Sequence, residues 1–257
     1  MKNPVIALQL YTIRDFTAAD LEGTLRKVKE MGFNAVELAG MYGLTAPELK
    51  ALLDEIGLAA FSAHVPYADF ERDMEGTIAA YKSLGCKFVA IPYLSKSNIP
   101  GPEGENWPHV REVMKKSAAL CKEANMPLMY HNHAFEFEKL ENGKYILDEI
   151  FSDVPGIAAE LDSGWVTAAG ECPVAYIKKY ASRCPVVHLK DTIKVENGFE
   201  DRPVGSGSQD MEAIIKTAIE CGVSGFVVEL DKAVGVTSLE AAQASLEYLK
   251  TLGHANG

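Results

Sequence analysis

The sequence predicts an α/β protein folded as a single (β/α)8 barrel. Three observations support this prediction. Short apolar runs alternate with amphipathic stretches eight times along 257 residues, a length that such barrels commonly reach as one domain. The apolar runs, such as 226–228, have no polar alternation, as expected for strands whose two faces are both covered. No G-x-G-x-x-G motif follows the first run, which argues against an open dinucleotide-binding sheet.

The eight predicted strands are the apolar runs that lie between polar turns. They cover 5–10, 34–38, 58–64, 88–93, 128–131, 157–161, 186–189 and 225–230. Most of the stretches that follow have apolar residues three or four positions apart, the spacing of an amphipathic helix. The helices are predicted near 18–31, 46–56, 71–84, 108–125, 146–151, 173–181, 210–221 and 238–252. Long loops are expected at 95–107 and after residue 189.

Residues at the predicted helix ends agree with these boundaries. Gly32 and Gly222 directly follow helices, where glycine readily adopts the left-handed conformation. Ser208 or Asp210 is suited to cap the helix that begins near residue 210. No linker or low-complexity segment divides the sequence, so residues 1–257 are expected to form one domain.

The composition describes an acidic globular protein with a net charge of −11 and 47% hydrophobic residues. An acidic surface argues against nucleic acid and anionic membranes as partners, and no apolar run approaches the roughly 20 residues of a membrane span. The start lacks the long apolar segment of a signal peptide, and the five scattered cysteines contain no CxxC pair. We therefore expect a cytoplasmic protein with a small-molecule ligand, and the sequence leaves a homo-oligomer open.

Residues 126–136, Met-Pro-Leu-Met-Tyr-His-Asn-His-Ala-Phe-Glu, carry the strongest local signal. A buried strand here leads into His131 and His133, which are two residues apart and so point to the same face. Imidazole nitrogens bind divalent metals, and Glu136 offers a carboxylate oxygen nearby. The alternative is a pair of hydrogen-bonded histidines that close a loop.

In a barrel, the carboxyl ends of all strands meet at one rim, where active sites lie. Seven of the eight predicted strands bring polar or ionisable side chains to this rim. In chain order these are Gln9 and Tyr11, Glu37, His64, His131 and His133, Glu160 and Asp162, His188 and Lys190, and Glu229. Burying such groups without partners costs several kcal/mol each, so a shared cation and a polar ligand are expected among them.

Some of these residues also have a purely structural explanation. Glu37 could pair with Arg14 or Lys190, Glu160 could neutralise Lys190, and His64 could be a hydrogen-bonded core histidine. Ligand-type side chains at the ends of three consecutive strands are harder to explain as coincidence. They are Asp162, His188 and Glu229. Trp165 is more often a packing residue, although an aromatic ring at the rim also lets a sugar stack.

The segment after the seventh strand, 202–211, contains two glycines that allow a sharp turn or a close approach of the backbone to a ligand. A phosphate could bind there at the helix N-terminus. Asp210 at that position opposes an anion, and a tight turn explains the glycines equally well.

Taken together, these segments resemble the xylose-isomerase-like TIM-barrel superfamily, the group of sugar phosphate isomerases and epimerases. The resemblance is carried by 9–15, 32–38, 130–137, 160–165, 187–191, 204–207 and 228–230. It implies a metal site formed by His131, Asp162, His188 and Glu229. Many relatives have Glu where His131 stands and His where Trp165 stands. That missing Glu often serves as one of two opposed bases, and Glu136 or Glu160 is expected to substitute for it.

The resemblance implies a divalent-metal-dependent isomerase or epimerase that acts on a keto sugar. A Mn²⁺, Mg²⁺, Co²⁺ or Zn²⁺ ion would stabilise the enediolate formed when the α-proton leaves. Glu229 is the expected first base and Glu160 or Glu136 the second, while Lys190 and His64 would stabilise oxyanion charge. Substrate contacts are expected from Gln9, Tyr11, Glu37, His64, His133, Trp165 and Arg202.

Other functions remain compatible with the same residues. With one base and an acid near a β-hydroxyl, the site would catalyse elimination, as in the histidine-rich inositol-pathway dehydratases of this superfamily. A non-catalytic sugar-binding barrel is a second alternative, and proton exchange with solvent distinguishes it from an enzyme. A metal-dependent abasic-site endonuclease is disfavoured by the acidic charge and by too few ligands for a trinuclear site.

Overall fold

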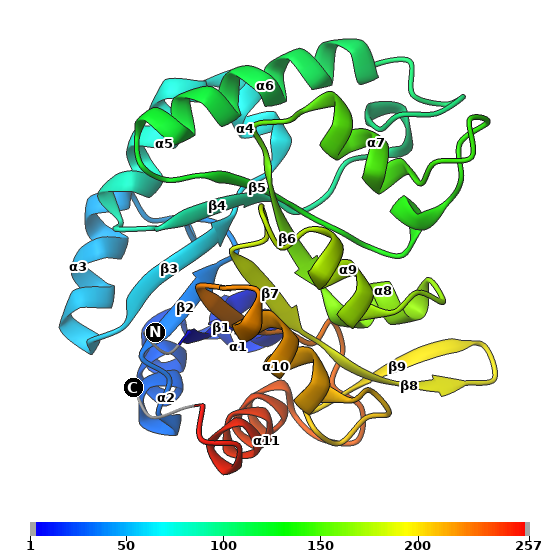
Figure 1. Cartoon of the computed structure of the whole chain (residues 1–257). Helices are drawn as coiled ribbons and strands as arrows, with labels where there is room; N and C mark the ends of the chain where they lie inside the picture. Colours follow the sequence, from blue (N-terminus) through cyan, green and yellow to red (C-terminus); the bar gives the residue numbers. More distant parts are fainter. Residues whose placement is uncertain (1–3, 255–257) are drawn as a thin grey trace.

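The computed structural model describes residues 4–254 and shows a closed barrel of eight parallel strands inside a ring of helices (Figure 1). The barrel strands are β1 (Val5–Gln9), β2 (Ala35–Leu38), β3 (Ala59–His64), β4 (Phe88–Ile91), β5 (Leu128–His131), β6 (Ala158–Asp162), β7 (Val186–Leu189) and β10 (Gly225–Val228). Each strand pairs with its neighbours in chain order, and β10 pairs with β1 to close the barrel. The predicted fold class is confirmed.

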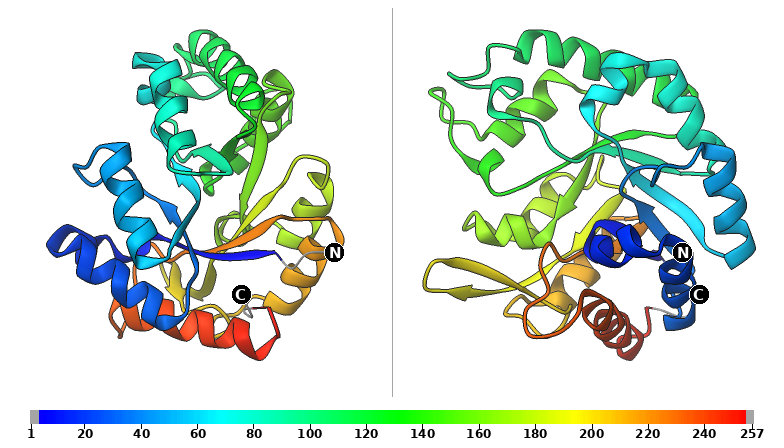
Figure 2. Two further views of the ribbon diagram at one scale, coloured as in Figure 1. Left: turned by 90° about the vertical axis from the view of Figure 1, so that its left-hand side faces the viewer. Right: turned by 180° about the vertical axis from the view of Figure 1, so that it is seen from behind.

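The helices cover the outside of the barrel from all sides (Figure 2). They are α1 (Arg14–Ala19), α2 (Leu21–Met31), α3 (Ala46–Ile56), α4 (Tyr67–Arg72), α5 (Met74–Ser83), α6 (Trp107–Glu123), α7 (Ile146–Asp153), α8 (Ser163–Ala168), α9 (Pro173–Lys179), α10 (Met211–Glu220) and α11 (Ser238–Thr251), with the short 3-10 helices η1 (Leu10–Ile13), η2 (Lys96–Asn98) and η3 (Phe135–Phe137). Across residues 4–254, none of these helices has the length and apolar character needed to cross a membrane.

Two of the predicted helices are in fact divided. The helix expected at 18–31 is split between α1 and α2 at Asp20, and the one expected at 71–84 is split between α4 and α5 at Asp73. Both aspartates have non-helical backbone angles, and each side chain accepts a hydrogen bond from the backbone N–H three residues later. This is the geometry of a helix N-cap, so each aspartate starts a new helix.

The segment after β7 was predicted as a loop, and this prediction was wrong. It forms an antiparallel hairpin of β8 (Asp191–Val195) and β9 (Gly198–Arg202), which extends away from the barrel (Figure 1). The Asn-Gly pair at 197–198 is a common hairpin turn signal. Asp210, by contrast, caps α10 as predicted, since its side chain accepts a hydrogen bond from the N–H of Ala213.

The barrel interior changes from apolar to polar toward the carboxyl ends of the strands. An apolar plug fills the other end of the barrel, formed by Ala7, Ala35, Phe61, Ala90, Met129, Val186 and Val227. Successive inward-facing residues of a strand are two positions apart. Two residues beyond plug members stand Gln9, Glu37, His131, His188 and Glu229. The plug therefore supports a layer of ionisable side chains from below.

Candidate metal and substrate site

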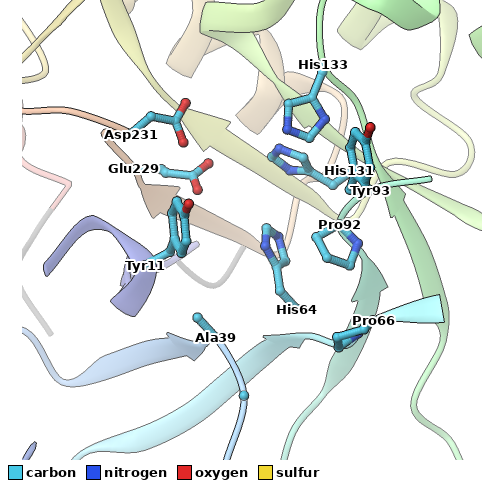
Figure 3. A pocket seen from close by; sticks show the side chains of 11 residues that line it. Tyr11, Ala39, His64, Pro66, Pro92, Tyr93, His131, His133, Glu229 and Asp231 are labelled. Atoms are coloured by element: carbon cyan, nitrogen blue, oxygen red, sulfur yellow. The ribbon is translucent and has the colours of Figure 1, made fainter. Parts of the chain in front are cut away.

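A cavity of about 410 Å³ opens at the carboxyl ends of the barrel strands (Figure 3). Its lining consists of Tyr11, Ala39, Gly40, His64, Pro66, Pro92, Tyr93, His131, His133, Glu229 and Asp231. The volume falls within the range of about 300–1,000 Å³ that is usual for small-molecule sites. The cavity therefore lies where a barrel of this kind carries its chemistry.

Four buried residues beside the cavity form a group that fits a divalent cation, here called the metal quartet. His131, Asp162, His188 and Glu229 each offer one ligand atom, and these atoms lie within 4.8 Å of one another. Two imidazole nitrogens with two carboxylate oxygens make a donor set suited to ions such as Zn²⁺ or Mn²⁺. The structure brings together the four residues that the sequence singled out.

Unpaired atoms in the metal quartet support this assignment. Among the described residues, the buried Asp162 Oδ2 and His131 Nδ1 make no hydrogen bond, and the nearest opposite charges to them are Lys190 Nζ at 3.3 Å and Glu160 Oε2 at 3.4 Å. Buried polar atoms are rarely left unpaired in folded proteins, and an unpaired one often marks the place of an ion or water. The donor set and its unpaired atoms fit a bound cation, whose identity stays open.

Lys190 supplies a fixed positive charge next to the metal quartet. Its Nζ lies 3.3 Å from Asp162 Oδ2, 3.4 Å from Glu229 Oε2 and 2.6 Å from Asp231 Oδ2. Burial opposes the charged form, but these carboxylates outweigh it and raise the pKa of Lys190 well above its usual value. Lys190 therefore stays an ammonium ion, which suits the predicted role of stabilising negative charge.

The two carboxylates of the quartet differ in protonation. Burial raises the pKa of Asp162 to about 7, and the charge of Glu229 adds to this rise. Burial also opposes the ionisation of Glu229, but Lys190 and His188 outweigh it and hold the pKa of Glu229 well below its usual range. Of the two carboxylates, Asp162 is therefore the one that takes up a proton more readily, and Glu229 stays ionised.

A second polar layer lies beneath the quartet, and its two glutamates do not line the cavity. Glu37 and Glu160 are fully buried. His64 Nε2 lies 2.8 Å from Glu160 Oε2 and 3.2 Å from Glu37 Oε1, and His188 Nε2 lies 2.9 Å from Glu37 Oε1. Gln9 Nε2 donates to the same Glu37 oxygen at 2.7 Å. The glutamates thus serve as counter-ions to the two imidazoles.

The burial of three residues beneath the quartet corrects three predictions. Glu160 was expected as a second base, and Gln9 and Glu37 as substrate contacts. All three are fully buried and absent from the cavity lining. Burial would raise the pKa of Glu160, but His188 and His64 outweigh it and lower this pKa well below its usual range. His64, in contrast, does line the cavity, as predicted.

Glu136 is fully buried and does not line the cavity, so its position does not support the predicted role as a base. Tyr130, whose side chain belongs to the core between strands and helices, donates its hydroxyl to Glu136 Oε1 at 2.8 Å. The backbone N–H of His133 donates to Glu136 Oε2 at 2.7 Å. Burial raises the pKa of Glu136 to about 7. Glu136 braces the loop that carries His133 instead of facing a ligand.

Of three further predicted substrate contacts, one lines the cavity and two do not. His133 lines the cavity, and burial, assisted by the charge of Lys190, lowers its pKa to about 4, so the ring is neutral. Trp165 is absent from the lining and packs behind it, with its ring 4.9 Å from Lys190 Nζ. Arg202 also lies outside the lining, since its guanidinium donates to Glu200 Oε2 at 2.8 Å within β9. The prediction for Arg202 is not supported.

Two lining residues with polar side chains, Asp231 and Tyr93, were not predicted. Asp231 stands two positions after Glu229, the same spacing that places Glu160 with Asp162 and His188 with Lys190, so this signal was available. Tyr93 follows β4, the one strand to which the sequence assigned no rim residue, because its end carries no charged or imidazole side chain. Tyr11 was predicted and does line the cavity.

The glycine-containing segment after β9 does not present a free anion site. The carboxylate of Asp191 accepts hydrogen bonds from the backbone N–H groups of Gly205, Gly207 and Gln209 at 3.0, 2.9 and 3.3 Å. A phosphate at this loop would use the same N–H groups. The loop is folded around the chain's own carboxylate, and the phosphate alternative is not supported.

The fold and the site together place the chain in a known family. The profile of the xylose isomerase-like TIM barrel family matches residues 25–252, and the chain belongs to this family. A curated relative, the inosose dehydratase of Clostridium beijerinckii, is 26% identical over 261 residues, covering 85% of each protein.

Solved structures share the same fold. The crystal structure of a sugar phosphate isomerase/epimerase from Parabacteroides distasonis has a TM-score of 0.82 at 22% identity, covering 100% of this chain and 96% of that one. A structure described as the IOLI protein with a binding zinc atom has a TM-score of 0.70 at 17% identity, covering 97% and 98%. At these identities the structures establish the fold, and the chemistry has to be argued from the site.

Proposed function

We propose that this protein is a divalent-metal-dependent enzyme that removes the proton next to the carbonyl of a keto sugar or keto-inositol and then eliminates a β-substituent. The observation that carries the proposal is the buried metal quartet beside a cavity of small-molecule size. A bound cation would supply Lewis-acid polarisation of the substrate carbonyl. The relative named inosose dehydratase supports elimination chemistry.

The arrangement of the carboxylates favours elimination over epimerisation. Epimerisation by proton transfer requires bases on opposite faces of the substrate. Among residues 4–254, the carboxylates that line the cavity are Glu229 and Asp231, and both come from the end of β10, side by side (Figure 3). Glu160 and Glu136 do not line the cavity. A base on one side only is sufficient for elimination.

Three residues at the cavity or directly beside it have roles in this proposal. Glu229 is ionised, as a base must be. The Lys190 ammonium lies within 3.4 Å of both quartet carboxylates and limits the charge that builds up as the proton leaves the carbon. His64, held at Nε2 by Glu160, faces the cavity and is suited to protonate the departing group. Zinc is one candidate ion because a structural relative is described with it; manganese, magnesium and cobalt are the others.

The experiment is a turnover assay in D₂O on purified protein whose metal content has been determined by elemental analysis. Inosose and simple keto sugars are supplied in turn. Loss of water with formation of an unsaturated ketone identifies a dehydratase. Deuterium at the α-carbon without loss of water identifies an epimerase or isomerase. Metal and sugar binding with no deuterium incorporation identifies a non-catalytic sugar-binding barrel.

A paired substitution tests the metal quartet. His188→Ala should lower both the metal content and the rate, whereas His109→Ala on the exposed face of α6 should leave both unchanged. Full activity in metal-free wild-type protein would reject the proposed chemistry.

A further inference from the structure

About half of the cavity lining is apolar. This half consists of Ala39, Gly40, Pro66 and Pro92, with Tyr11 and Tyr93 at its edges. Apart from the two phenol hydroxyls, these side chains have no hydrogen-bonding atom. A sugar or inositol ring carries hydroxyl groups around its edge, and a hydroxyl buried without a partner is destabilising. This half is therefore better suited to a flat apolar group than to a polyol.

Tyr11 is held in position before any ligand arrives. The guanidinium carbon of Arg14 lies 4.1 Å from the centroid of the Tyr11 ring. Arg14 also donates to the carbonyl of Tyr11 at 2.8 Å and to the carbonyl of Asp231 at 2.7 Å. Arg14 thus braces one side of the ring, and the Tyr11 side chain remains 44% exposed.

Tyr93 is braced in a comparable way on the other side of the cavity (Figure 3). Its ring meets His133 and Phe135 edge to face, with centroid distances of 5.9 and 5.7 Å, and it remains 54% exposed. Rings that are fixed in advance lose little freedom when a ligand binds, which favours affinity. The two tyrosines thus form a preorganised aromatic pair at the mouth of the apolar half.

We propose that the substrate carries a flat aromatic substituent, which lies between Tyr11 and Tyr93 while the polyol lies at the metal quartet. The inference rests on the proposed function for the chemistry of the polyol and adds the class of substituent. A second sugar ring also stacks on aromatic rings, but its hydroxyls would then be buried against Ala39, Pro66 and Pro92. The chemistry of the lining therefore favours an aromatic group over a disaccharide.

The test is calorimetric titration with three unreactive probes, phenyl β-glucoside, glucose and cellobiose, at a fixed zinc concentration. Stacking and apolar burial of one ring predict that phenyl β-glucoside binds roughly ten- to a hundredfold more tightly than glucose. Cellobiose should gain little. Tyr93→Ala and Tyr11→Ala should each reduce the difference in affinity between phenyl β-glucoside and glucose, and Tyr93→Phe should preserve it. Phe199→Ala, at an exposed ring on β9 outside the lining, is the matched control.

Several results would overturn the inference. They are equal affinities for glucose and phenyl β-glucoside, no measurable binding of the phenyl compound, tighter binding of cellobiose, or an unchanged gain in both alanine variants that circular dichroism shows to be folded. The probes do not react, so this result is independent of turnover. If phenyl β-glucoside binds more tightly than glucose but the D₂O assay shows no proton exchange, the aromatic subsite is supported and the proposed function is rejected. If simple keto sugars are turned over but phenyl β-glucoside binds no more tightly than glucose, the proposed function is supported and the aromatic subsite is rejected.

Discussion

Replacing Lys190 with methionine tests whether its charge and a bound cation have the same function. Lys190 is 1% exposed, and its ammonium lies 2.6–3.4 Å from three carboxylates. Methionine keeps most of the side-chain volume and removes the charge. In protein without metal, Asp162, Glu229 and Asp231 would then be left without their positive partner, and the folded state should lose stability.

The expected loss is large. Removing one partner of a buried ion pair costs about 3–5 kcal/mol, and 1 kcal/mol shifts the unfolding temperature of a protein of this size by about 2–4 °C. Lys190→Met without metal should therefore unfold roughly 6–20 °C below wild type. A bound cation would neutralise Asp162 and Glu229 instead, so addition of metal should raise the unfolding temperature more in the variant than in wild type.

Differential scanning calorimetry at one scan rate, with EDTA or with excess Zn²⁺, measures both effects. Lys232→Met is the matched control because Lys232 lies in the neighbouring loop and is exposed. The loss should also shrink toward pH 5, since Asp162, whose pKa is already raised to about 7, takes up a proton there. The reasoning fails if Lys190→Met is no less stable than Lys232→Met, or if metal stabilises both variants equally.

Three further substitutions test other parts of the site. Burial raises the pKa of Glu136 to about 7, so the free energy of unfolding of wild type falls as pH rises from about 4.5 to 7. Glu136→Gln lacks this carboxyl, and its free energy of unfolding should therefore gain about 3 kcal/mol relative to wild type over this range. Urea unfolding measures this difference, and a difference that is independent of pH would contradict the expectation. A Cβ at Gly164 would meet Lys190 Cγ at 2.6 Å, so Gly164→Ala should cost about 1–3 kcal/mol, and Lys190→Ala should cost less in that background than alone. Glu37→Gln should weaken zinc binding by roughly ten- to a hundredfold, measured by competition with a chelator, whereas Glu136→Gln, at an equally buried carboxylate, should leave it unchanged.

Much of the fold follows from local patterns in the sequence. The bounds of α3 agree with the prediction because a capping box at Thr45 and a left-handed Gly57 mark its ends. The predicted helices at 18–31 and 71–84 were too long because apolar spacing continues across Asp20 and Asp73. Apolar spacing reports which face of a helix is buried, and only the capping residue reports where the helix begins.

Within the site, the sequence predicts the direction of a side chain but not its depth in the barrel. Alternation along a strand predicts which side chains point into the barrel, and the family resemblance then implied which four of them form the metal quartet. Alternation does not give depth, because depth depends on how the strands are staggered around the barrel. Glu160 and Asp162 both point inward, but two residues along a strand span about 7 Å. That distance places Asp162 in the quartet and Glu160 in the polar layer below.

His188 connects these two layers and gives the lower layer a part in the chemistry. Its Nδ1 lies 2.8 Å from Glu229 Oε2, on the side of the quartet, and its Nε2 lies 2.9 Å from Glu37 Oε1, on the side below. An imidazole that binds a metal through Nδ1 must carry its proton on Nε2. Glu37 Oε1 is nearer to that nitrogen than the carboxylate of Glu160, at 2.9 Å against 3.5 Å, and a carboxylate beside the outer nitrogen of a metal-bound imidazole favours this tautomer and increases the basicity of the ligand. The depth that excludes Glu37 from contact with a substrate is thus the depth at which it can orient a metal ligand.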